Sequence, residues 1–247
     1  MNTELVIAAV QNASLARDLA GNVEHHVGQA RQAITAGAHL VVFPELSLTG
    51  YELIFGSEHP VALDDERLAP LRALASAHHV VIVAGAPVSG TTAPQIGALV
   101  FGADGEIGVY AKHHLHPGED AFFHPGTASI PLTVADANVS LAICADIDHD
   151  EHAAQARDAG ADLYAAGVLM SASGLGDCLD RMTRYARNHR MAVLMANHAV
   201  PTGGWTPACT STIWAPDGSI VASARSGEAI VIARRRGADW SGEVLTV

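Results

Sequence analysis

The sequence predicts an α/β protein with mixed β-sheets. Apolar runs rich in Val, Ile and Ala alternate with amphipathic stretches through most of the chain, which is the pattern of sheets covered by helices. Asp-Gly pairs at 104–105 and 217–218 each separate two short apolar runs and predict two hairpins, which argues against a wholly parallel barrel. With 247 residues and 49% hydrophobic content the chain can bury a full core, so we expect a single domain over residues 1–247.

The expected elements follow from the positions of the apolar residues. The first strand covers residues 4–11, and the amphipathic helix after it has Asn22 as its expected N-cap. Apolar residues at helical spacing predict further helices over about 64–77, 148–159 and 177–190. Apolar runs between turns or helices predict the other strands, at 40–43, 80–88, 98–112 with the first hairpin turn, 139–144, 162–168, 192–197 and 210–224 with the second turn.

Charge and cysteine content exclude several classes of protein. The chain has 26 acidic residues against 14 Lys and Arg, a formal charge of -12, and no basic run, so nucleic acid and anionic membranes are not expected partners. The first residues lack a basic segment with a cleavage site, and their apolar run is far shorter than the ~20 residues that span a bilayer. Cys144, Cys178 and Cys209 show no CxxC spacing, which argues against disulfides and a thiolate zinc site. We expect a cytoplasmic protein, in which any functional cysteine acts as a single thiol.

Three reactive side chains stand where an apolar strand ends. Glu45 follows the strand at 40–43, Lys112 ends the hairpin, and Cys144 ends the strand at 139–144. Strand ends of α/β folds collect catalytic groups, because the sheet fixes their position while the loops vary. A carboxylate, an ammonium and a thiol in one crevice are a set of groups that can hydrolyse an amide.

Amide hydrolysis would use all three groups. A thiol with a reference pKa near ~8.5 is mostly protonated at neutral pH, so Glu45 would accept its proton and later protonate the leaving nitrogen. Attack by Cys144 creates an oxyanion, for which Lys112 and the N–H of Ala145 are candidate donors, at roughly 3 to 4 kcal/mol for one good donor. Taken singly, each residue also has an ordinary explanation, as a small buried hydrophobe or a solvated charge.

Several segments of the chain resemble the nitrilase superfamily of carbon–nitrogen hydrolases, and they occur in the family order: IAAVQ at the start, VVFPELSLTGYE, YAKHHLHPGE, AICADI and the late APDG turn. The resemblance is to an amidase-like branch. It implies a four-layer α-β-β-α sandwich of two mixed β-sheets covered by helices, with a catalytic triad of Glu45, Lys112 and Cys144. It implies that Glu119 positions the lysine and the substrate, and that the N–H of Ala145 lies in the oxyanion hole. A homodimer or higher homo-oligomer and a small linear amide or carbamoyl substrate are also implied, with nitriles as the alternative substrate.

The segment after the cysteine departs from the family pattern. Many amidase branches have C-Y-D-x-R-F-P-E, where this chain has Cys-Ala-Asp-Ile-Asp-His-Asp-Glu over 144–151. Asp148 stands in place of the arginine, so we expect the site to disfavour a substrate carboxylate and to favour neutral or cationic amides. Asn197, at the end of the strand at 192–197, is a further candidate for the pocket wall, with turn formation as the other explanation.

Two alternative functions remain open at this point. One is a metal-dependent hydrolase, because the loop at 113–124 holds a cluster of possible ligands and His149 and His152 lie three apart. The HxxxH and HExxH spacings are absent, however, and we expect no metal. The other alternative is a non-catalytic binding module on the same fold. The members of the loop cluster are His113, His114, His116, Glu119, Asp120 and His124.

Other motifs are weaker. Asp146, Asp148 and Asp150 imitate the start of a calcium loop, but the later ligands of such a loop are missing. Acids near a helix N-terminus more simply complement its dipole, which is the expected role of Asp150 and Glu151. Dinucleotide, Walker and serine-hydrolase motifs are absent, so no cofactor is expected.

Overall fold

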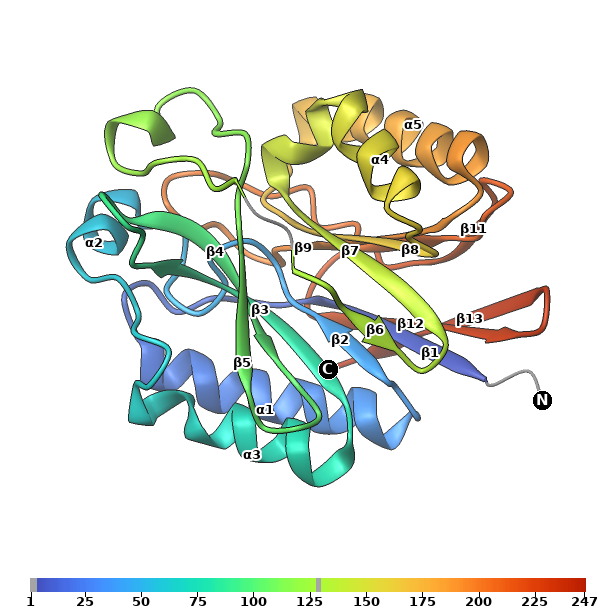
Figure 1. Cartoon of the computed structure of the whole chain (residues 1–247), viewed down its shortest axis with the longest axis horizontal. Coiled ribbons are helices and arrows are strands. Elements are labelled where there is room, and N and C mark those ends of the chain that lie inside the picture. Colours follow the sequence, from blue (N-terminus) through green and yellow to red (C-terminus); the bar gives the residue numbers. More distant parts are fainter. Residues whose placement is uncertain (1–3, 128–129) are drawn as a thin grey trace.

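The computed structural model describes residues 4–127 and 130–247, and its centre consists of two mixed β-sheets packed face to face (Figure 1). The seven-stranded sheet has the order β13 (Asp239–Thr246), β12 (Ala229–Arg236), β1 (Leu5–Gln11), β2 (Leu40–Val42), β3 (Val81–Val88), β4 (Gln95–Phe101) and β5 (Ile107–Ala111). The six-stranded sheet has the order β11 (Ile220–Ser223), β10 (Thr212–Trp214), β9 (Ala192–Asn197), β8 (Leu163–Val168), β7 (Ala137–Ile143) and β6 (Thr133–Val134).

Helices cover the outer face of each sheet (Figure 1). The seven-stranded sheet is covered by α1 (Leu19–Thr35) and α3 (Ala69–His78), and the six-stranded sheet by α4 (Asp150–Asp158) and α5 (Ala172–His189). Connecting segments hold α2 (Leu53–Glu58) and the 3-10 helices η1 (Glu66–Leu68), η2 (Glu119–Ala121) and η3 (Cys144–Asp148). The predicted four-layer α-β-β-α sandwich is therefore confirmed. Over the described residues, no helix has both the length and the apolar character that crossing a bilayer requires.

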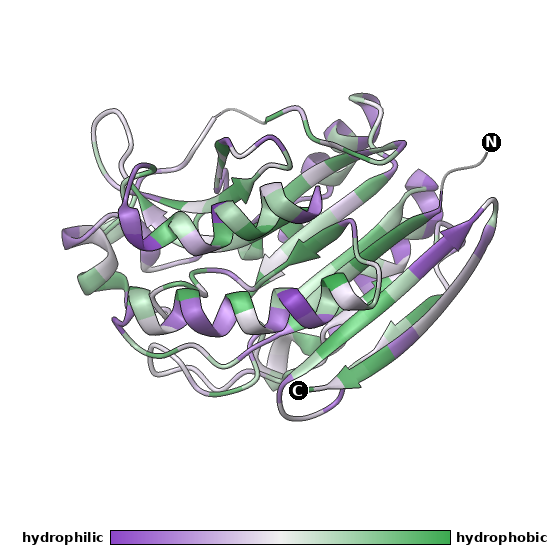
Figure 2. Ribbon diagram, turned by 90° about the horizontal axis from the view of Figure 1, so that it is seen from below, coloured by the Kyte–Doolittle hydropathy of each residue, from purple (hydrophilic) through white to green (hydrophobic). Residues whose placement is uncertain are grey.

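Alternating side chains on the strands separate the layers, because successive residues of a strand point to opposite faces of its sheet. In β1, Leu5 and Ile7 join the core between the sheets, whereas Val6 and Ala8 pack in the core under α1 and α3. Strand β8 repeats this pattern between the central core and the core under α4 and α5. Figure 2 shows the result, with mostly hydrophobic strands and helices that carry hydrophilic residues beside hydrophobic ones.

Both predicted hairpins are present, since β4 pairs antiparallel with β5 and β10 pairs antiparallel with β11. Two helix starts differ from the expectation. Helix α5 begins at Ala172, before the expected start at 177, and η3 occupies the residues before α4. Strands β12 and β13 lie outside the expected elements; β12 pairs antiparallel with β1.

The expected N-cap of the first helix was wrong. Asp18 caps α1, and its side chain accepts a hydrogen bond of 2.9 Å from the N–H of Gly21. Asn22 lies inside the helix and is fully buried, where its amide accepts from the N–H of Leu15 and donates to the carbonyl of Leu48. The Asn22 side chain therefore holds the segments at Leu15 and Leu48 against the helix. The N-cap is the carboxylate of Asp18.

The strand order brings three strand ends to the space between the sheets. In the seven-stranded sheet β2 and β3 are parallel, β4 is antiparallel to β3 and β5 is antiparallel to β4, so β2 and β5 end at the same edge. Glu45 and Lys112 follow these two strands, and Cys144 follows β7 of the other sheet. The candidate catalytic residues thus come from both halves of the sandwich.

Candidate active site

Glu45 lies on a segment that threads between the two sheets, and only 1% of it is exposed. Two glycines make room for this segment. A Cβ on Gly85 would lie 2.2 Å from the amide nitrogen of Leu46, and a Cβ on Gly167 would lie 2.7 Å from the carbonyl oxygen of Phe43. The carbonyl of Glu45 lies 2.8 Å from Nε2 of the buried His198, so its backbone is held as well as its side chain.

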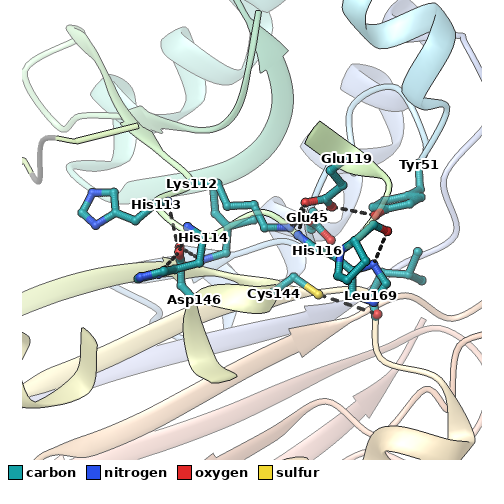
Figure 3. A network of polar contacts seen from close by, with 12 residues as sticks. Glu45, Tyr51, Lys112, His113, His114, His116, Glu119, Cys144, Asp146 and Leu169 are labelled. Carbon is teal, nitrogen blue, oxygen red and sulfur yellow. Dashed lines mark hydrogen bonds and ion pairs between the residues drawn. The ribbon is translucent and has the colours of Figure 1, made fainter. Parts of the chain in front are cut away.

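Lys112 lies between two buried carboxylates (Figure 3). Its Nζ donates to Oε1 of Glu45 at 2.6 Å and to both carboxylate oxygens of Glu119 at 2.8 Å. Glu119 also accepts a hydrogen bond of 2.6 Å from the hydroxyl of Tyr51 and one of 2.7 Å from the N–H of His116. Both oxygens of Glu119 are thereby occupied. Oε2 of Glu45, in contrast, has no hydrogen-bond partner among the described residues, so it is the oxygen that can take up a proton.

Cys144 stands at the turn between β7 and η3. Its φ of 41° lies in the left-handed region, which is costly for a residue with a side chain, and such strain is typical of functional sites. The preceding Ile143 is still extended, so the chain turns sharply at the cysteine. The thiol is partly exposed, and its Sγ lies 3.8 Å from the carbonyl oxygen of Leu169 (Figure 3). The turn presents the sulfur to the space in front of Glu45 and Lys112.

Asp146 connects the turn after β7 to the loop after β5. It is fully buried, and its Oδ1 accepts from the N–H groups of His113 at 3.0 Å and His114 at 2.8 Å. Its Oδ2 accepts from the N–H of Ile143 at 2.9 Å and the hydroxyl of Tyr110 at 2.7 Å. One carboxylate therefore fixes the backbone beside the lysine relative to the backbone beside the cysteine.

Replacing Asp146 by asparagine is expected to lower the free energy of unfolding by about 2 to 4 kcal/mol, because an amide cannot accept all these hydrogen bonds and places a donor against donors. Urea unfolding would measure the change. Asp148→Asn is the matched control two residues later; its exposed carboxylate should cost no more than about 0.5 kcal/mol. Equal losses in the two variants would contradict the anchoring role of Asp146.

Burial and charge set the protonation states of the three groups. Burial raises the pKa of Glu45 to about 7, against the opposing attraction of Lys112. Burial and the nearby Glu45 raise the pKa of Cys144 above its ordinary value. Burial alone would lower the pKa of Lys112, but the charges around it, first that of Glu45, outweigh this and raise the pKa. At neutral pH the site therefore holds a neutral thiol, a charged lysine and a glutamate near its titration point.

A cavity of about 330 Å³ opens in front of the cysteine. Glu45, Tyr51, Cys144, Leu169 and Met170 line the part of its wall that includes the reactive groups. This volume lies at the small end of the range for ligand sites, so a short substrate fits it best. The Cys144 thiol and the Glu45 carboxylate lie at this wall, and the Lys112 ammonium is buried behind it, 2.6 Å from Oε1 of Glu45.

Comparisons with known proteins agree with this geometry. The profile of the carbon–nitrogen hydrolase family matches residues 6–241. The chain belongs to the carbon–nitrogen hydrolase family. A hydrolase of Pseudomonas protegens from the 5′ region of pqqF is 30% identical over 227 residues, which cover 87% of this chain and 77% of that protein. A nitrilase of Pyrococcus abyssi is 33% identical over 141 residues, which cover 55% of this chain and 53% of that protein.

The fold of this carbon–nitrogen hydrolase is shared with an amidase of the nitrilase superfamily from Nesterenkonia sp. AN1. The two chains superpose with a TM-score of 0.83 at 23% sequence identity, and the match covers 92% of each. Structures of that amidase include a covalent acrylamide adduct at its active-site cysteine and a complex of a cysteine variant with butyramide. The family match over residues 6–241, together with the shared stretch in a nitrilase, confirms the predicted resemblance to the nitrilase superfamily.

The other predicted site residues of this hydrolase differ in their position relative to the cavity. Ala145 is the first residue after the cysteine and is buried in η3. Asn197, a candidate either for the pocket wall or for turn formation, is fully buried and is not among the residues that line this cavity. Its side-chain oxygen accepts from the N–H of Met170, and its amide group donates to the carbonyls of Met170 and Cys209. Asn197 therefore holds the backbone of Met170, which does line the cavity.

Asp148 lines the cavity, as expected, but its charge is not alone. Its Oδ1 forms an ion pair with the guanidinium of Arg181 on α5, which also lines the cavity. Asp148 stands where many amidase branches have an arginine, so the chain has one cation fewer in the segment after the cysteine. Arg181, 33 residues later on α5, supplies a cation at this wall of the cavity. Arg181 was missed because helical spacing alone does not show which side chain reaches a distant loop.

The histidines of the loop at 113–124 make ring contacts in two places. His113 and His114 lie near His152, with ring centroids 5.3 and 6.0 Å from its ring, and His114 also stacks on His149 at a centroid distance of 3.7 Å. His116 instead meets Trp205 edge-on at a centroid distance of 5.8 Å. Within residues 4–127 and 130–247 no group of three or more His, Cys, Asp or Glu side chains is placed to hold a metal ion. The acids of the calcium-like stretch also diverge: Asp146 contacts buried donors, Asp148 pairs with Arg181 and Asp150 pairs with Arg184.

Proposed function

We propose that this carbon–nitrogen hydrolase cleaves a small linear amide or carbamoyl compound through a thioester on Cys144. The observation that supports this most strongly is the arrangement of Lys112 between Glu45 and Glu119, with the one free oxygen of Glu45 and the thiol of Cys144 at the same cavity. Such a site has a nucleophile, a base and an oxyanion donor, and an amide needs all of these.

In the proposed reaction, Oε2 of Glu45 takes the proton of the Cys144 thiol as Sγ attacks the carbonyl carbon. The ammonium of Lys112 and the N–H of Ala145 stabilise the oxyanion of the tetrahedral intermediate. The protonated Glu45 gives its proton to the nitrogen, the C–N bond breaks, and ammonia or an amine leaves. Glu45 then deprotonates a water molecule that attacks the thioester; the acid is released and the thiol is restored.

Glu119 acts in this scheme by positioning. Its two oxygens accept from Lys112, Tyr51 and His116, so it has no oxygen left for a proton transfer. Holding Lys112 between two carboxylates keeps the ammonium charged and fixed in direction, which is what an oxyanion donor needs. We therefore assign the base to Glu45 and not to Glu119.

An amide is proposed ahead of a nitrile, which remains the alternative within the same family. The supporting comparison is the fold shared with an amidase whose structures contain small amides. A matching stretch in a nitrilase supports the alternative. The family match over residues 6–241 also supports one catalytic domain over 1–247, which we propose acts as a homodimer in the cytoplasm.

Release of ammonia or amine across a panel of short amides, carbamoyl compounds and nitriles tests the proposal. Mass spectrometry of the intact protein should detect an acyl group on Cys144 when the reaction is quenched early. Turnover of nitriles alone would select the alternative function. Turnover without any adduct, and without loss on replacement of Cys144, would reject the cysteine mechanism.

The rate is expected to depend on the ionisation of Glu45. Since the carboxylate must be deprotonated to accept the thiol proton, kcat/KM should rise with pH up to a pKa of about 7 and level off above it. The same raised pKa predicts that the contribution of Glu45 to stability is present below the ordinary value of 4.5 and is lost as the pH rises through about 7. A pH–rate profile with a neutral amide measures the first effect, and urea unfolding across the same pH range measures the second. A rate that is independent of pH across this range would contradict the assignment of Glu45 as the base.

A further inference from the structure

We infer that the cavity selects amides whose far end carries a cationic group, such as an ammonium, and that Asp177 on α5 is its partner. This inference rests on the proposed function and adds a substrate class to it. It concerns the part of the cavity wall that is built by α5, away from the buried triad.

One face of α5 forms this wall. Gly174, Asp177, Cys178 and Arg181 line the cavity, and their spacing of three and four residues places them on one side of the helix. Asp177 is exposed, and its carboxylate has no hydrogen bond or ion pair in the described part of the chain. It is therefore available to a ligand in the cavity without first giving up a partner.

The remaining charges of the cavity do not neutralise Asp177. Asp148 and Arg181 form an ion pair with each other, so together they add no net charge to the wall. Lys112 is the cation of the catalytic centre, and it is already shared by two glutamates. A carboxylate at the far end of a substrate would face Asp177 with a like charge, whereas an ammonium would gain a charge-assisted hydrogen bond.

Aromatic rings at the same cavity suit a cation as well. Trp205 lines the cavity with 45% of its surface exposed, and Tyr51 contributes a second ring. A cation that passes over the face of such a ring is attracted by its π electrons. The formal charge of -12 also favours the association of cations with the protein as a whole.

One feature favours the opposite charge. The first turn of α5 lines the cavity at Ser171, Ser173 and Gly174, and a helix N-terminus carries about half a positive charge. The full charge of Asp177 outweighs this partial charge at the same wall. The experiment must therefore compare both signs of charge at constant chain length.

Three amides provide this comparison: γ-aminobutyramide ends in an ammonium, pentanamide in a methyl group and succinamate in a carboxylate. Their chains are equally long when the terminal nitrogen, carbon or oxygen is counted. We expect kcat/KM to be highest for γ-aminobutyramide and lowest for succinamate. Asp177→Asn should lower kcat/KM for γ-aminobutyramide about tenfold, mainly through KM, and leave pentanamide unchanged, because only the charge-assisted hydrogen bond is lost. Asp180→Asn is the matched control, since Asp180 is exposed on the same helix but does not line the cavity. It should leave all three values unchanged.

Binding to the Cys144→Ala variant separates this inference from the proposed function. Calorimetry should find tighter binding of γ-aminobutyramide than of pentanamide, and the difference should disappear when Asp177→Asn is added. Cleavage of pentanamide without any cationic preference, in rate or in binding, would overturn the inference alone. Failure to cleave any amide, with the cationic binding preference intact, would overturn the proposed function alone. Preference for succinamate would assign the wall to the helix N-terminus and Arg181 instead.

Discussion

Replacement of Cys144 by alanine is expected to reduce amide turnover to background, a loss on the order of 10⁴-fold or more, because in the proposed mechanism the sulfur forms the bond on which both half-reactions depend. The fold should survive. The side chain is small and partly exposed, its Sγ makes one long contact with a carbonyl, and alanine keeps the Cβ at the left-handed position. Steady-state assays and thermal unfolding of the same preparation measure the two effects.

Cys209→Ala is the matched control for this replacement. Cys209 also has a positive φ of 56° and a partly exposed side chain, but it does not line the cavity. Its replacement should leave turnover close to that of the parent enzyme and should leave early acyl adducts on Cys144 intact. Substantial turnover in Cys144→Ala, with a normal rate in Cys209→Ala, would reject the thioester mechanism.

Replacement of Lys112 by methionine is expected to damage both stability and rate. It leaves the carboxylates of Glu45 and Glu119 buried without their cation, so the free energy of unfolding should fall by about 3 to 5 kcal/mol. The pKa of Glu45 should rise further, because the main opposing charge is gone. Turnover should fall about 10³-fold, since the oxyanion loses its ammonium donor.

The double variant Lys112→Met, Glu119→Gln separates the two effects. Removing one buried carboxylate should restore part of the stability, because only Glu45 remains and it can take up a proton. Turnover should stay low, since the ammonium is still missing. If the double variant recovered turnover together with stability, Lys112 would act only in packing and not on the reacting oxygen. Urea unfolding and steady-state kinetics on the same samples decide between these outcomes.

Much of this arrangement is predictable from local sequence patterns. Glu45, Lys112 and Cys144 each end a recognisable apolar run, and the ordered family segments connect them. Contacts between distant segments are a different matter. No pattern around Asp146 shows that it accepts hydrogen bonds from the loop after β5, and none around Tyr51 shows that its hydroxyl meets Glu119. Tyr51 lies in the segment VVFPELSLTGYE and Asp146 in AICADI, and their place in these two family segments is the one feature of the sequence that indicates a role near the site.

Two buried amides show why contacts between distant segments are hard to predict. Asn22 has the chemistry of an N-cap, and Asn197 ends a strand as pocket residues often do, but both amides hydrogen-bond to backbone groups of other segments. Buried polar groups must find partners somewhere, and local sequence does not say where. Asp148 is a similar case. The effect of its charge on a substrate depends on its ion pair with Arg181, which lies on α5.

Glu45, Lys112 and Cys144 come from both halves of the sandwich, so the proposed reaction depends on how the two sheets are aligned. Glu45 and Lys112 follow strands of one sheet, and Cys144 follows a strand of the other. A small slide of one sheet over the other would separate them long before either sheet lost its hydrogen bonds. The catalytic rate should therefore fall when the two sheets shift relative to each other. The apolar residues between the sheets, such as Leu141 and Leu194, therefore set the distance between the proposed catalytic groups as well as stabilising the fold.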